Sequence, residues 1–215
     1  MDSADQSSLS VVLNKVIDAE IAGAALENQS EIFEFLLSRI DQKNSYCRMP
    51  APTDQEMVSW PLLYTGEKIS SRVSASHILG EEASRAVIRL SDGSKEAKEA
   101  IESIAGIPNR LGPDEGWFCC RTCTISLWRH LSARGDNRRL EAGVARLRSG
   151  RKGDGRWDNS VFYYTVLALH TMEIPAAKEE LTYAASILEK TAKRNADSEV
   201  AQRRKLLAQK VLETL

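Results

Sequence analysis

The chain has 215 residues, of which 42% are hydrophobic and 27% charged, values that are ordinary for a folded globular protein. At roughly 150 residues per domain, this length predicts one domain or a closely fused pair. Twenty-nine Lys and Arg against 30 Asp and Glu leave a net charge of −1. So balanced a charge argues against a protein dedicated to coating nucleic acid, and no nucleic-acid partner is expected.

The sequence also argues against a membrane span and against secretion. No apolar run reaches the roughly 18–20 uncharged residues that a membrane helix needs. The opening segment, MDSADQSSLS, lacks both the basic start and the apolar stretch of a secretory signal. Without such a signal, the four cysteines are expected to be thiols in a reducing compartment. The protein is therefore expected to be cytoplasmic.

Apolar residues recur at helical spacing along the whole chain, which predicts an all-α fold. A capping box formed by Thr53 and Glu56 predicts a short helix through Trp60 and Leu63. The other expected helices are 8–24, 29–43, 73–91, 95–106, 119–134, 136–149, 160–172, 175–193 and 196–214. We expect residues 1–66 to form an N-terminal helical cap and residues 67–215 a region of helix pairs, within one continuous domain.

The later helices repeat with a period of about 41 residues. Trp117 in DEGWF and Trp157 in GDGRW each stand just before an apolar helix, 40 residues apart. Segments 119–131 and 161–172 are apolar nearly all round, whereas 136–149 carries charges on one face. This alternation predicts an inner layer of helices wrapped by an outer layer, in a partial toroid or a curved solenoid. Chance similarity between apolar helices is the alternative.

The segment RSGRKGDGRWDNSVFYYTVLAL (148–169) is a basic, glycine-rich turn that ends in Gly-x-Trp and leads into an aromatic helix. Over about residues 70–190 the chain resembles the α/α-toroid superfamily of protein prenyltransferase β-subunits and squalene or terpene cyclases. The resemblance implies a toroid-like array of helix pairs. The cyclases' Asp-x-Asp-Asp run and the zinc-binding Asp-x-Cys pair of the prenyltransferases do not occur in this sequence. The architecture is therefore carried over without the activities.

The segment 119–123, CCRTC, is the strongest local signal for chemistry, and it begins an expected inner helix. The candidate thiols are Cys119, Cys120 and Cys123. The positive end of the helix dipole and the nearby Arg121 both favour thiolates, which bind a soft metal or attack an electrophile. A tetrahedral zinc site has four ligands, so a further ligand would come from Cys47 or His77. The alternative is that the cysteines fill space in a packed core.

His77 precedes Glu81 by one helical turn. It is a candidate metal ligand or general base, with Glu81 orienting its ring. A histidine that is simply bonded to backbone or water at the start of a helix is the alternative. The neighbouring Glu82 falls in the expected inner layer, where a carboxylate needs a basic partner, so a structural salt bridge is expected.

Aromatic residues gather around the two equivalent turns. In a toroid such turns lie at one end of the central cavity, where aromatic walls suit an apolar or cationic ligand. The alternative is that these side chains belong to the core. The candidate ligand-binding residues are Trp117, Arg121, Trp157, Tyr163 and Tyr164.

The segment 129–157 contains nine Lys or Arg against three acids, a local net charge of +6. Such a patch could hold phosphate, nucleic acid or an acidic partner, and a solvated outer helix face is the alternative. The tail 190–215 is expected to pack as a closing amphipathic helix or to contact another chain, which would make a homo-oligomer.

Two functional hypotheses follow from these features. The first is a prenyltransferase- or terpene-cyclase-like helical domain that binds an apolar small molecule or a peptide on a concave inner face. The second is a metal-dependent enzyme with zinc as its cofactor, held by the CCxxC thiols and His77.

Overall fold

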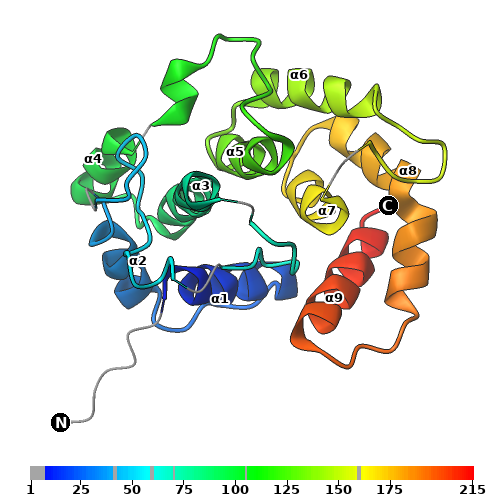
Figure 1. Ribbon diagram of the computed structural model, residues 1–215, viewed down its shortest axis with the longest axis horizontal. Coiled ribbons are helices and arrows are strands. Elements are labelled where there is room, and N and C mark those ends of the chain that lie inside the picture. Colours follow the sequence, from blue (N-terminus) through cyan, green and yellow to red (C-terminus); the bar gives the residue numbers. More distant parts are fainter. Residues whose placement is uncertain (1–7, 41–42, 59–60, 70, 105, 159–160) are drawn as a thin grey trace. The chain divides into compact units, whose positions relative to one another are not determined.

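The computed structural model describes residues 8–40, 43–58, 61–69, 71–104, 106–158 and 161–215 (Figure 1). The regular elements in these ranges are α-helices and one short 3-10 helix, and the loops between them contain two isolated β-bridges. The expected all-α fold is therefore confirmed. Contacts divide the chain into two compact units, one formed by the part before residue 63 together with 68–106, and the other by 63–67 together with 107–215.

The first unit is organised around α3 (Arg72–Leu90). Helices α1 (Leu9–Ala22), α2 (Gln29–Leu37) and α4 (Lys95–Ser103) each pack against α3. Apolar side chains at helical spacing on α1 and α3 meet in one core because each helix presents a stripe of them to the other. The buried residues of this core are Leu9, Val12, Leu13, Val16, Leu36, Leu79, Ala83, Ala86, Val87, Leu90 and Ile104.

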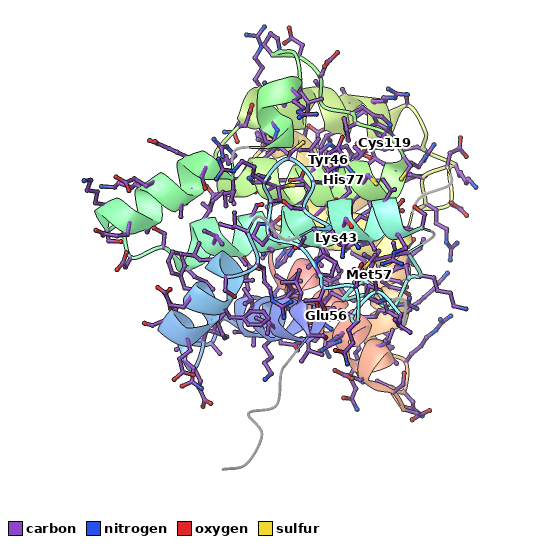
Figure 2. All side chains as sticks on the ribbon, turned by 60° about the vertical axis from the view of Figure 1, so that its left-hand side comes forward. Lys43, Tyr46, Glu56, Met57, His77 and Cys119 are labelled. Atoms are coloured by element: carbon purple, nitrogen blue, oxygen red, sulfur yellow. The ribbon has the colours of Figure 1, made fainter. Side chains whose placement is uncertain are left out.

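The expected short helix at Thr53 is a turn over residues 54–58, and Trp60 lies outside the described residues. The capping box itself forms: Glu56 Oε2 accepts the Thr53 N–H at 2.6 Å, and Thr53 Oγ1 accepts the Glu56 N–H at 3.3 Å. Glu56 also accepts the Leu9 N–H at the start of α1 and pairs with Arg39 at 3.1 Å. These tertiary bonds fix Glu56, which Figure 2 labels, without requiring a helix after it.

The described residues of the second unit form five α-helices and one 3-10 helix. They are η1 (Ile107–Arg110), α5 (Arg121–Ala133), α6 (Asn137–Arg148), α7 (Phe162–His170), α8 (Pro175–Ala192) and α9 (Glu199–Glu213). Helix α5 packs against α6 and α7, α8 packs against α6 and α7, and α9 packs along α8. The pairs α5–α6 and α7–α8 therefore stand side by side, and α5 and α7 begin 41 residues apart, as the sequence period predicts.

The two members of each pair differ in burial, as the alternation of apolar and charged segments predicts. Residues 123–131 of α5 and 164–169 of α7 are all buried. In α6 the buried residues are Leu140, Gly143, Val144 and Leu147, which lie on one face. The toroid-like arrangement of such pairs remains a prediction.

Glycine permits the close approach of α6 to the turn before α5. A Cβ atom on Gly116 would lie 2.1 Å from the Arg139 carbonyl oxygen and 2.2 Å from the Gly143 nitrogen. Trp128, which is fully buried, donates its indole N–H to the Gly116 carbonyl at 2.7 Å. This packing fixes the position of the turn that carries Trp117.

Within the part of the chain that the structure describes, no helix has both the length and the apolar character needed to cross a membrane.

Candidate functional site

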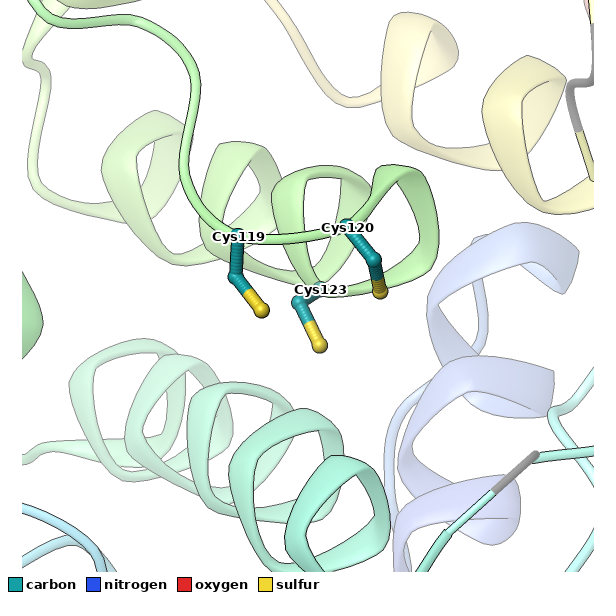
Figure 3. Close-up of side chains that lie close together, drawn as sticks. All are labelled: Cys119, Cys120 and Cys123. Carbon is teal, nitrogen blue, oxygen red and sulfur yellow. The ribbon is translucent and has the colours of Figure 1, made fainter.

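Three cysteines lie together at the beginning of α5. The sulfur atoms of Cys119, Cys120 and Cys123 all lie within 4.8 Å of one another. Figure 3 shows the three side chains extending to the same side of the start of the helix. Cys119 and Cys120 are exposed and Cys123 is buried. The structure thus brings together the three thiols that the sequence singled out.

The local backbone explains this grouping. Cys119 has φ +51°, in the left-handed region that non-glycine residues seldom adopt. Cys120 is the N-cap of α5 and makes no side-chain capping bond. The hydroxyl of Thr124, in the first turn of α5, accepts the Phe118 N–H at 3.1 Å and lies 2.5 Å from the Phe118 carbonyl oxygen. These bonds fold the segment before Cys119 back onto the helix. A non-glycine residue held in the left-handed region, as Cys119 is, is often found at functional sites.

A cavity of about 410 Å³ opens beside the thiols. Its walls come from the start of α5, the end of α6 and the turn that follows α6. The wall residues that bear chemistry are Trp117, Cys119, Cys120, Arg121, Arg146 and Asp158. Two of the expected ligand-binding residues and two of the expected metal ligands therefore line one cavity.

Two guanidinium groups lie over the indole of Trp117. The central carbon of Arg146 is 4.5 Å from the ring centroid, and that of Arg121 is 5.8 Å from it. Trp117 in turn packs edge-on against the buried Trp128, with ring centroids 5.8 Å apart. Cation–π contacts therefore hold both positive charges at the cavity wall.

The other aromatic candidates lie elsewhere in the second unit. Trp157 is 2% exposed and Tyr164 is 1% exposed, so both are core residues. Tyr163 is half-buried, contacts Thr191 through its hydroxyl at 3.0 Å, and lies under the guanidinium of Arg204 at 4.5 Å. Tyr163 lines a second, smaller cavity of about 180 Å³ beside the start of α9.

Glu180 on α8 is a fully buried carboxylate that sequence reasoning missed. It accepts the Trp157 indole N–H at 2.8 Å, the Arg148 Nε–H at 2.9 Å and two N–H groups of Arg151 at 2.9 and 3.0 Å. The bond to Glu180 raises the pKa of Arg148. Glu180 thereby ties the glycine-rich turn 149–158 to α8. Glu179 and Glu180 look alike in the sequence, and only the fold distinguishes the buried one.

His77 lies in the first unit, on α3, and is buried there. Its Nε2 is 3.6 Å from Glu81 Oε1, one helical turn away, which is the pairing that the spacing predicts. The ring of Tyr46 lies against it, with centroids 5.1 Å apart, and both residues are labelled in Figure 2. Cys47, the other candidate ligand, also belongs to the first unit. The three-cysteine cluster belongs to the second.

The basic stretch 129–157 is largely neutralised by ion pairs. Arg139 pairs with Asp136 at 2.6 Å, and Arg138 pairs with Asp114 at 2.6 Å, a contact that lowers the pKa of that carboxyl. Arg148 pairs with Glu179 and Glu180, and Arg151 also pairs with Glu180. Lys152 pairs with Asp158, and Arg156 pairs with Asp154. Among the described residues, Arg146 has no carboxylate partner, and neither has Arg121.

We compared the chain with protein-family models, with curated proteins and with solved structures, and none of them matches it.

Proposed function

We propose that this protein binds a soft metal cation, with Zn²⁺ as the leading candidate, through Cys119, Cys120 and Cys123. The observation that supports the proposal is the grouping of three sulfur atoms within 4.8 Å of one another. Zinc–sulfur bonds are about 2.3 Å long, so sulfurs bound to one tetrahedral ion lie about 4 Å apart. Small side-chain rotations would bring the observed thiols to that spacing.

Three protein ligands would leave one coordination position for a water molecule or another ligand, as in catalytic zinc sites. Cys119 and Cys120 line the 410 Å³ cavity, so that position would be close to a space that admits a small molecule. The cavity wall carries arginines and thiols, which favours a polar ligand at this site over an apolar one. This supports the metal-binding hypothesis more strongly than the hypothesis of an apolar ligand.

Metal analysis of tag-free protein tests the proposal. We expect one zinc ion per chain, and on substitution by Co²⁺ we expect the thiolate-to-cobalt charge-transfer absorption in the near ultraviolet. Cys119→Ser and Cys120→Ser should each reduce bound zinc and weaken that absorption, because thiolate is the preferred ligand. Both residues are exposed, so the variants are expected to fold.

Cys47→Ser is the matched control, because it removes a thiol from the first unit and leaves the cluster intact. Metal binding in this variant should equal that of the wild type. Protein that contains no zinc, takes up no Co²⁺ when reduced, and unfolds identically with and without chelator would refute the proposal. A disulfide between Cys120 and Cys123 in such protein would indicate a redox pair instead.

A further inference from the structure

The cavity beside the three-cysteine cluster carries a second feature that the thiols do not explain. Arg121 and Arg146 present two positive charges to it, and neither has a carboxylate partner among the described residues. Elsewhere in α6 and the turn after it, arginines are paired with acids, as Arg139 is with Asp136 and Arg148 with Glu179 and Glu180. Among the described residues, Arg146 is therefore the one arginine of α6 and the turn after it that has no acid partner, and Arg121 on α5 has none either.

Both arginines are held in place without a counter-ion. Both guanidinium groups lie over the indole of Trp117, 4.5 Å (Arg146) and 5.8 Å (Arg121) from its centroid, and Trp117 is itself fixed by its edge-on contact with the buried Trp128. Because Gly116 and Gly143 have no side chains, the backbone of this turn packs directly against α6. Less conformational entropy is lost on binding when the donors are already oriented, so such a pair is suited to recognise a ligand.

Guanidinium groups match carboxylate and phosphate oxygens through paired N–H donors. The acid that lines the cavity is Asp158, whose Oδ1 lies 3.6 Å from Lys152 Nζ. Lys152 offsets the negative charge of Asp158, so the net charge at the cavity is positive. A volume of about 410 Å³ is within the range of cavities that hold small organic ligands.

We infer that Arg121, Arg146 and Trp117 form an oxyanion-binding subsite for a small molecule that carries a carboxylate or a phosphate group. The subsite deepens the proposed function, on which its role depends: it would hold the charged end of a ligand whose other end reaches the open coordination position of the metal. Binding of the oxyanion itself requires only the arginines, so it can be measured without the metal.

Calorimetric titration of the full chain, metal-free and reduced, tests this inference. The probes are succinate, inorganic phosphate and succinamide, the last being an uncharged analogue of succinate. We expect succinate or phosphate to bind and succinamide not to bind. Tighter binding of succinate would identify a carboxylate ligand, and tighter binding of phosphate a phosphorylated one; affinity should fall as salt is raised.

Arg121→Gln and Arg146→Gln should each weaken binding about tenfold or more, because each removes charge-assisted hydrogen bonds. Arg134→Gln is the matched control. It removes the same charge from the exposed C-cap of α5, at the opposite end of that helix from Arg121, and should bind as the wild type does. Circular dichroism establishes that all three variants are folded.

Equal affinities for succinate and succinamide, or equal losses in all three arginine variants, would overturn the inference. So would the absence of binding of both anions. The Cys119→Ser/Cys120→Ser double variant separates this result from the fate of the metal proposal. Anion binding that persists in the double variant supports the subsite even if the wild type binds no metal, and metal binding without anion binding refutes the subsite alone.

Discussion

Gly143 lies inside α6, where replacement of glycine by alanine ordinarily stabilises a helix by about 1 kcal/mol. The tertiary structure predicts the opposite sign for Gly143→Ala. The new Cβ would lie 2.5 Å from Trp128 Nε1 and 2.6 Å from the Gly116 carbonyl oxygen. Those two atoms are joined by a buried hydrogen bond of 2.7 Å. The methyl group therefore cannot enter without moving the indole or the backbone of the turn before α5.

The expected magnitude combines three effects. Overpacking of a core costs about 1–3 kcal/mol. Loss of the indole hydrogen bond costs about another 1 kcal/mol. The gain in helix propensity, about 1 kcal/mol, offsets part of this. We expect Gly143→Ala to lower the free energy of unfolding by roughly 1–3 kcal/mol.

Urea denaturation, followed by circular dichroism and by tryptophan fluorescence, measures this change. Gly112→Ala is the control, because the atoms nearest to a Cβ there belong to the Glu115 side chain, at an ordinary 3.5 Å, and its stability should be close to that of the wild type. An unfolding free energy of Gly143→Ala equal to or above that of the wild type would show that the contact between α6 and the turn is looser than described.

Two further predictions concern carboxylates, the buried Glu180 and the half-buried Glu67, and both are measured by urea denaturation. Glu180→Ala should lower the free energy of unfolding by about 1–3 kcal/mol, because the buried indole of Trp157 loses its acceptor. Glu179→Ala is the control, because its site is mainly exposed, and it should change the free energy of unfolding little. Similar losses in both variants would contradict the structural role given to Glu180. Burial raises the pKa of Glu67 above its unfolded value near 4.5, so the folded state binds the proton more tightly. The stability that protonated Glu67 contributes is fully present below the pKa of the unfolded state. It is lost as the pH rises through the pKa of the folded state. The wild type should therefore lose stability relative to Glu67→Gln as the pH rises from about 4 to 7, and a difference that does not vary with pH would contradict the shift.

The candidate site shows which parts of a functional arrangement follow from local sequence. Cys120 and Cys123 are three positions apart at the start of a helix, so their proximity follows from helix geometry. A helix from residue 119 would place Cys119 one turn before Cys123, but α5 begins at Arg121. Cys119 joins the other two through a left-handed backbone and the bonds of Thr124 to Phe118, which the sequence does not signal. Arg146 is 25 positions after Arg121 in the sequence, and only the packing of α6 on α5 places both guanidiniums over one indole.

By itself, the sequence determined the helical class, the ends of most helices to within a few residues and the 41-residue spacing of α5 and α7, because hydrophobic periodicity and capping are local. Tertiary structure decided where individual polar side chains go. Glu180 is buried between arginines and an indole while Glu179 faces solvent, and the capping box of Thr53 and Glu56 is followed by a turn over residues 54–58. These outcomes depend on partners far away in the chain, and the free energy of burying a charge is set by those partners rather than by its neighbours in sequence.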